Sequence, residues 1–113
     1  KRRLQVVKIK LYQIAPEKDD KNLMFMGYEF TALHGGINAG SYELVFDGDL
    51  PVQTAEDAFR IFNLEHPNGY RGRSMSVSDI VWMAGIGYWF CDSVGFRQIK
   101  FAGEKCCWRK FDG

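Results

Sequence analysis

Residues 62–95 constrain the fold more than any other part of the chain, because turn-forming residues divide this segment at short intervals. His66-Pro67 and Asn68-Gly69 end the element before them, since proline disfavours a helical conformation at the preceding residue and Asn-Gly favours a turn. Two apolar runs of strand length follow, over residues 76–83 and 88–92, and a short glycine loop joins them. This pattern predicts a β-hairpin directly after an irregular loop.

A helix is predicted immediately before that loop. Thr54 is followed three residues later by Asp57, an acidic variant of the capping box that begins helices. Apolar residues then recur at the spacing of one helix face: Ala55, Ala58, Phe59 and Phe62. We expect this helix to end near Leu64 or Glu65.

Three more segments show the period-two alternation of strands: residues 4–14, 42–46 and 96–101. In the first of these, Lys8, Lys10 and Tyr12 alternate with the apolar residues Val7, Ile9 and Leu11. The period of two places the two lysines on the water-exposed face, with Tyr12 on the same side of the strand. Asp47-Gly48-Asp49 predicts a turn that ends the second strand. Residues 23–33 are apolar without a clear period, and we predict a strand running into irregular structure.

The length of 113 residues and the 46% hydrophobic content suit one domain with one core. We therefore predict a single α+β domain over residues 1–113: an antiparallel sheet of four to six strands with one main amphipathic helix packed on one face. Residues 1–3 and 104–113 are expected to be flexible ends. Because the chain begins with Lys1 rather than Met, we expect it to be a segment of a longer protein.

Charge and cysteine content exclude several classes of function. A net charge of +1 provides no global attraction to nucleic acid or to an acidic membrane, so such binding requires a local patch. Cys91, Cys106 and Cys107 lack the spacing of a zinc site, and the glycine loops lack the Lys-Ser/Thr of a phosphate-binding loop. We predict no metal, no cofactor and no membrane span, and a cytoplasmic location, where thiols stay reduced.

The loop over residues 66–78 is the predicted functional surface, because polar loops on rigid scaffolds carry function. The candidate binding residues in and beside it are His66, Tyr70, Arg71, Arg73, Ser74, Ser76 and Asp79. Cations beside an aromatic ring predict contact with a protein partner or a nucleic acid, through Tyr70, Arg71 and Arg73. The serines and Asp79 are expected to hold the loop in shape.

An alternative hypothesis is a small hydrolase-like enzyme that uses His66 with a serine of residues 74–78. Such a nucleophile needs a base within hydrogen-bond reach and an oxyanion hole. Neither the Gly-x-Ser-x-Gly elbow nor the Ser-x-x-Lys spacing is present. The sequence therefore favours a non-catalytic protein.

Several short motifs occur together in one order: Phe62-Asn63, His66-Pro67, Gly72-Arg73-Ser74, Ser76-Val77-Ser78-Asp79 and Asp92-Ser93-Val94-Gly95-Phe96. In this combination the chain resembles the YodL-like domain family, over roughly residues 4–101. The resemblance implies a non-catalytic accessory module of a bacterial mobile-element protein, such as one encoded on a conjugative element. It brings no catalytic residues, and Arg73 stands where the family commonly has His.

Overall fold

A computed structural model describes residues 6–109 as a six-stranded sheet with two helices. The strands in sheet order are β5 (Phe96–Ile99), β4 (Gly87–Cys91), β3 (Ile80–Met83), β1 (Val7–Ile14), β2 (Tyr42–Leu50) and β6 (Cys107–Trp108). Neighbouring strands are antiparallel, except that β6 runs parallel to β2. This arrangement confirms the predicted α+β class with an antiparallel sheet.

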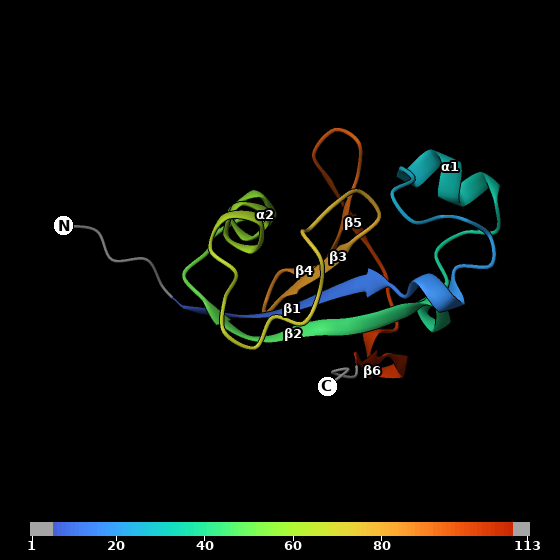
Figure 1. The fold of residues 1–113 in the computed structure, drawn as a ribbon. Helices are drawn as coiled ribbons and strands as arrows, with labels where there is room; N and C mark the ends of the chain where they lie inside the picture. The colour runs from blue at the N-terminus through green and yellow to red at the C-terminus, as the bar shows by residue number, and fades with distance from the viewer. Residues whose placement is uncertain (1–5, 110–113) are drawn as a thin grey trace.

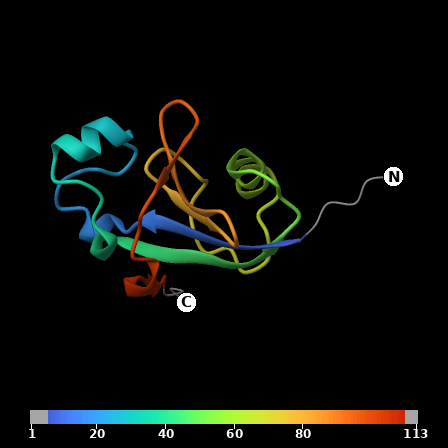
Figure 2. The ribbon, with the colours of Figure 1, turned by 180° about the vertical axis from the view of Figure 1, so that it is seen from behind.

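The two helices lie near opposite ends of the long β1–β2 pair (Figure 1). They are α1 (Tyr28–Leu33) and α2 (Ala55–Leu64), and three short 3₁₀ turns cover Pro16–Lys18, Ala39–Ser41 and Gly103–Lys105. Seen from behind, the chain after β5 runs down past the sheet to β6, beside β2 (Figure 2). No helix in residues 6–109 has the length and apolar character needed to cross a membrane.

The helix α2 begins and ends where the sequence predicts. The Thr54 hydroxyl accepts a hydrogen bond from the Asp57 N–H at 3.1 Å, and the Asp57 carboxylate accepts one from the Thr54 N–H at 3.2 Å. This reciprocal pair is a complete capping box. The residues of α2 buried against the sheet are Ala55, Ala58, Ile61 and Phe62. Phe59, predicted on this face, is partly buried and packs against Phe96.

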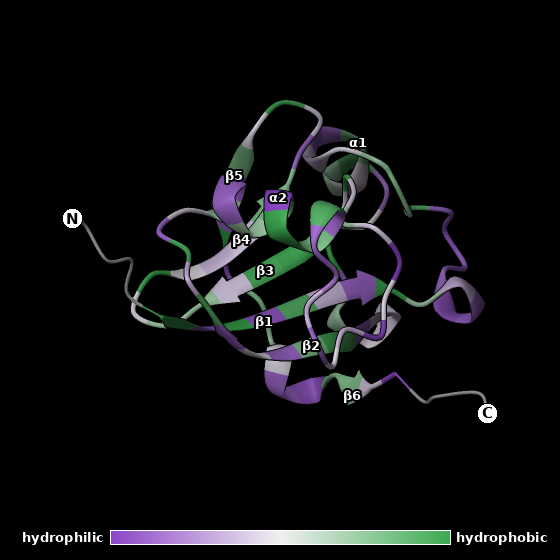
Figure 3. Ribbon diagram, turned by 60° about the vertical axis from the view of Figure 1, so that its left-hand side comes forward, coloured by the Kyte–Doolittle hydropathy of each residue, from purple (hydrophilic) through white to green (hydrophobic). Residues whose placement is uncertain are grey.

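Apolar side chains form a cluster on each face of the sheet. Ile9 and Leu11 of β1 belong to the cluster under α2, whereas Tyr12 and Ile14 belong to the other. In Figure 3 the ribbon of β3 is mostly hydrophobic, whereas hydrophobic and hydrophilic residues alternate along β1. The prediction that Tyr12 lies on a water-exposed face is wrong, because Phe101 packs against its ring at 5.2 Å and leaves it 2% exposed.

Three predicted segments have a different structure. Residues 23–33 are a turn followed by α1 rather than a strand, because Asp19 and Asp92 accept hydrogen bonds from backbone N–H groups of this segment. Residues 47–49 continue β2 opposite β1 instead of turning. Residues 76–79 form a turn, so β3 begins only at Ile80.

The two ends of the chain are described only in part. Within residues 104–113, for which flexibility is expected, Cys107–Trp108 pair with β2 and the Arg109 N–H donates to the Leu44 carbonyl at 3.0 Å. Residues 110–113 and residues 1–3 lie outside the described residues.

Candidate functional site

The loop from His66 to Asp79 joins α2 to β3 and is tied to the sheet by a β-bulge. The β1–β2 register shifts between Leu11 and Tyr12, so that Val45 has no partner across the pair. Its carbonyl instead accepts a hydrogen bond from the Arg71 N–H at 2.8 Å. The bulge thus supplies an acceptor that regular pairing would not leave available.

Gly72 lets the loop approach the sheet closely. A Cβ at this position would lie 2.3 Å from Gln13 Oε1 and 2.9 Å from Val45 Cγ2. Both distances are shorter than any normal carbon contact, so a side chain here would push the loop away from β1 and β2.

Gln13 of β1 holds the loop from inside the protein. Its side chain is fully buried and pairs with the Arg73 backbone in both directions: Nε2 donates to the Arg73 carbonyl at 2.9 Å, and Oε1 accepts from the Arg73 N–H at 3.1 Å. The same Nε2 donates to Asp79 Oδ2 at 2.9 Å. The Gln13 amide therefore makes the hydrogen bonds that a neighbouring strand would otherwise make with the Arg73 N–H and carbonyl.

Asp79 is 0% exposed, and its Oδ2 also accepts from the Ser76 N–H at 2.8 Å. Arg73 Nη2 lies 3.5 Å from Asp79 Oδ1, an ion pair without a hydrogen bond. Burial raises the pKa of Asp79 to about 7, against the lowering effects of the Ser76 N–H, the Arg73 guanidinium and the Gln13 amide. Desolvation outweighs the ion pair, so the carboxyl titrates near neutral pH.

Two residues predicted to contact a partner are used inside the fold. Arg73 Nη1 donates to the Ile14 carbonyl at 3.2 Å, and the guanidinium lies 5.2 Å from the centre of the Phe25 ring. The Tyr70 hydroxyl donates to the Arg73 carbonyl, and burial raises the pKa of that hydroxyl. Both side chains hold the loop together, which is the role predicted for the serines and Asp79.

Ser78 connects the loop to the opposite side of the sheet. It is fully buried with a φ of 84°, in the left-handed region. Its hydroxyl accepts a hydrogen bond from the Phe25 N–H at 3.0 Å, and its carbonyl accepts one from the Tyr42 hydroxyl at 2.6 Å. Of the predicted serines, Ser76 donates to the Ser74 carbonyl at 3.2 Å, and Ser74 is exposed.

The motif Phe62-Asn63 also has a structural role. The Asn63 amide donates to the Met75 carbonyl at 3.1 Å, and its carbonyl accepts from the Met75 N–H at 2.6 Å. Asn63 thereby fixes the far half of the loop to the last turn of α2, while the Phe62 ring packs on Phe46 and Tyr70.

The outer face of the loop carries Arg71 and His66. The Arg71 guanidinium lies 4.9 Å from the centre of the Trp108 ring and donates to the Arg109 carbonyl at 3.2 Å. The exposed His66 imidazole stacks on Tyr70 with ring centres 6.1 Å apart. Within the described part of the chain, no hydrogen bond joins the His66 side chain to a serine, and the hydrolase hypothesis stays untested.

Sequence reasoning missed Gln13, Tyr42 and Phe25, which come from distant segments and complete this arrangement. Gln13 carries one signal, since it is a polar residue in an otherwise apolar part of a strand. Among residues 6–109, no three His, Cys, Asp or Glu side chains lie close enough together to hold a metal ion.

These features define a small α+β domain whose long loop is held by buried polar side chains. The chain belongs to the YodL-like domain family, which it matches over residues 8–101. The matched range contains the motifs of the loop and the residues of β1 and β2 that hold it. No curated protein and no solved structure matches the chain significantly.

Proposed function

We propose that this domain is a non-catalytic binding module that recognises a protein partner through the exposed face of the 66–78 loop. The observation that carries the proposal is that the buried polar groups of the loop make their hydrogen bonds and ion pair within the protein. The Asp79 carboxylate, the Arg73 guanidinium and the Gln13 amide bind one another or the backbone. A loop held in this way presents a fixed surface, which lowers the entropic cost of binding.

The distribution of charge favours a protein over a nucleic acid as partner. Four arginines each lie within 4 Å of a carboxylate: Arg60 with Asp57, Arg73 with Asp79, Arg97 with Asp92, and Arg109 with Glu43. Lys8 is paired with Asp47 at 3.3 Å. Nucleic-acid surfaces need cations available to phosphates along a continuous track, and pairing of this kind opposes such a track.

The proposed contact surface centres on Arg71, Trp108 and His66. Trp108 is 44% exposed although Arg71 stacks on it, and arginine and tryptophan are enriched among the residues that dominate binding energy in protein interfaces. The module would act in the cytoplasm within a bacterial mobile-element protein, as the family resemblance implies. A reducing compartment suits its three free thiols.

The test compares the wild-type domain with an Arg71→Ala/Trp108→Ala double variant. The control variant is Arg60→Ala, since the Arg60 guanidinium pairs with Asp57 on α2. Proteins captured from a bacterial host extract are identified, and the affinity of each purified candidate is measured. We expect wild type and Arg60→Ala to bind one partner equally, and the double variant to bind it at least about tenfold more weakly. Equal binding by all three would reject this surface.

A second measurement separates protein from nucleic-acid binding. Fluorescence anisotropy of labelled single-stranded DNA, duplex DNA and RNA is recorded with the domain at two salt concentrations. The proposal expects no binding that depends on Arg71. Binding that weakens steeply with added salt and is lost in the double variant would identify a nucleic-acid module instead.

A further inference from the structure

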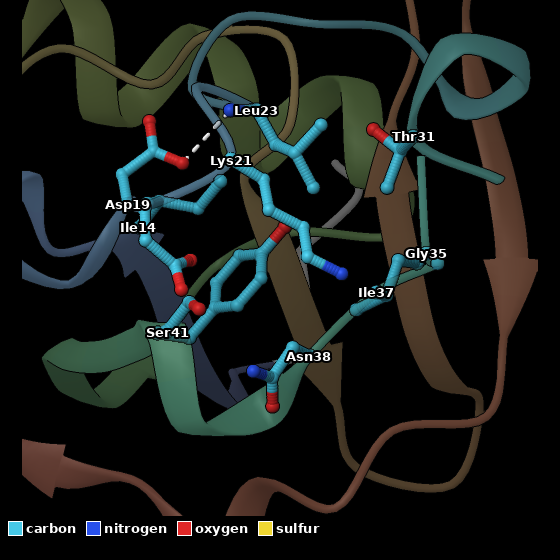
Figure 4. A pocket seen from close by; sticks show the side chains of 12 residues that line it. Ile14, Asp19, Lys21, Leu23, Thr31, Gly35, Ile37, Asn38 and Ser41 are labelled. Atoms are coloured by element: carbon cyan, nitrogen blue, oxygen red, sulfur yellow. Dashed lines mark hydrogen bonds between the residues drawn. The ribbon is translucent and has the colours of Figure 1, made fainter. Parts of the chain in front are cut away.

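A cavity of about 310 Å³ lies on the side of the sheet away from α2, between residues 19–23, the helix α1 and the segment 35–42 (Figure 4). Its volume is at the lower end of the roughly 300–1,000 Å³ found for small-molecule sites. None of its lining residues belongs to the proposed contact surface around Arg71. The inference below therefore goes beyond the proposed function.

Lys21 supplies a cation to this cavity. Its side chain extends across the cavity towards Gly35 and Ile37 (Figure 4), and a Cβ on Gly35 would lie 2.3 Å from Lys21 Nζ. Gly35 also has a φ of 105°, so this backbone both suits glycine and leaves room for the ammonium. Within residues 6–109 no carboxylate lies within 4 Å of Lys21 Nζ.

The nearest acidic neighbours in sequence do not neutralise this ammonium. Asp19 accepts hydrogen bonds from the Leu23 and Met24 N–H groups at 2.8 and 3.0 Å, and so stabilises the turn beside the cavity. Asp20 lines the cavity and is exposed. These two carboxylates disfavour a ligand with more than one negative charge.

Thr31 of α1 provides a second, independent indication of a ligand. The residue is 3% exposed and lines the cavity, yet its Oγ1 has no hydrogen-bond partner within the described structure. A buried hydroxyl without a partner is costly and uncommon. A ligand oxygen in the cavity would satisfy it.

Beside the polar side chains of Asn38 and Ser41, one part of the lining is apolar and can contact the other end of a ligand. Ile14, Leu23 and Ile37 contribute aliphatic surface. Tyr42 also lines the cavity, and the hydrogen bond from its hydroxyl to the Ser78 carbonyl holds its side chain in place. The cavity thus combines one available cation and one available hydroxyl with an aliphatic surface, and the carboxylates of Asp19 and Asp20 also line it.

We propose that this cavity binds a small monocarboxylate with an apolar body. The carboxylate accepts hydrogen bonds from Lys21 Nζ and Thr31 Oγ1, because a charge-assisted bond to an ammonium is the strongest contact this lining offers. The apolar body packs against Ile14, Leu23 and Ile37 and displaces water from them.

The test uses ¹⁵N-labelled domain and three probes that separate the two features of the ligand. Benzoate carries a carboxylate and an apolar body, inorganic phosphate carries charge without the body, and benzylamine carries the body with the opposite charge. We expect benzoate to shift the backbone amide signals of Thr31, Gly35 and Gly36 in a saturable manner. Phosphate should bind at least about tenfold more weakly, and benzylamine should cause no saturable shift.

Matched variants locate the site. Lys21→Met keeps the length of the side chain and removes its charge, and it should weaken benzoate binding at least about tenfold. Thr31→Val removes only the hydroxyl and should weaken binding several-fold. Lys105→Met, at an exposed lysine outside the cavity, should bind as wild type does.

Three results would overturn the proposal. They are no saturable shift with benzoate, unchanged benzoate affinity in Lys21→Met, and equal affinity for benzylamine. A dispersed amide spectrum for each variant confirms that it is folded, so loss of binding cannot be attributed to unfolding. The outcome is independent of whether a protein partner binds at Arg71.

Discussion

Gln13 Nε2 donates a hydrogen bond of 2.9 Å to Asp79 Oδ2, joining β1 to the end of the 66–79 loop across 66 positions of sequence. Both side chains are fully buried. The bond places a residue from outside the motif segment at the centre of the loop that the motif defines. The recognisable residues of the loop therefore depend on β1 for their structure.

The ionisation of Asp79 should make stability depend on pH. Its pKa in the folded domain is about 7, against 3.8 for the unfolded chain, so the folded state holds one more proton between these values. This contribution is complete below pH 4 and is lost as pH rises through 7. We expect this group to lower the free energy of unfolding of wild type by up to about 4 kcal/mol over this range.

Urea unfolding at pH 5, 6, 7 and 8 measures this dependence in wild type and in Asp79→Asn, which has no proton to lose. Between pH 5 and 7 the variant should show a much smaller decrease than wild type. Asp49→Asn, at an exposed position of β2, is the matched control. A wild-type stability that rises over this range would show that the ion pair with Arg73 outweighs burial.

Replacing Gln13 should destabilise the fold more than its polar character suggests. Gln13→Leu removes the partner of the Arg73 backbone N–H and carbonyl and one hydrogen bond of the buried Asp79 carboxylate. Leaving such groups buried and unsatisfied costs about 2–4 kcal/mol. Gln98→Leu is a suitable control, because Gln98 is exposed and its side-chain amide donates to the Ile86 carbonyl. Equal losses in the two variants would contradict a special role for Gln13.

The elements that the sequence predicted well are those with local causes. The Thr54 to Asp57 capping box and the apolar spacing after it determine α2, and the glycine loop before β4 determines the hairpin. Both depend on residues within a few positions of one another. The bounds of α2 and the pairing of the two hairpin strands could therefore be predicted without the rest of the chain, whereas β3 begins four residues later than predicted.

Distant residues contribute to two of the wrong predictions. Residues 23–33 are apolar and strand-like, but Asp19, Asp92 and Ser78 bind their N–H groups and fix a turn and a helix instead. Tyr12 is buried because Phe101, 89 positions later (101 − 12 = 89), covers it. No periodicity in either segment contains this information.

The sequence predicts that Tyr70 and Arg73 contact a partner, and that prediction stays open. In the structure the Tyr70 hydroxyl donates to the Arg73 carbonyl of the loop, and the Arg73 guanidinium donates to the Ile14 carbonyl of β1. A cation beside an aromatic residue in a polar loop has the same sequence pattern whether it contacts a partner or stabilises the loop. Only the positions of Gln13 and Asp79 in space show the contacts that these side chains make within the fold.

Asn63 should be as important for the loop as the residues within it. Asn63→Ala removes both hydrogen bonds to the Met75 backbone, which is part-buried, and should cost about 1–3 kcal/mol of stability. Asn68→Ala, at an exposed turn position, should change stability by no more than about 0.5 kcal/mol. Chemical denaturation of the two variants measures both. A loss in Asn63→Ala no larger than in Asn68→Ala would show that the loop is held elsewhere.

The capping box of α2 offers a separate test, because α2 forms one end of the loop. Thr54→Ala removes the acceptor for the Asp57 N–H and should cost about 1 kcal/mol, while Thr54→Ser keeps the hydroxyl and should restore most of it. The hydrogen bonds from the Gln53 and Thr54 N–H groups lower the pKa of Asp57 in the folded domain. The stability gained from its ionised form is therefore present at neutral pH and is lost as pH falls through that lowered value.

An Asp57→Asn variant should accordingly be less stable than wild type at pH 7 and approach it in acid. This direction is opposite to that expected for Asp79→Asn, whose carboxyl has its pKa raised by burial. Urea unfolding of the two variants from pH 3 to pH 8 compares them directly, with wild type as reference. Because both carboxylates flank the same helix and loop, opposite pH dependences would show that the local environment of each carboxyl determines its contribution to stability. The same pH dependence in both variants would show that the pKa of at least one carboxyl is not shifted in the direction stated above.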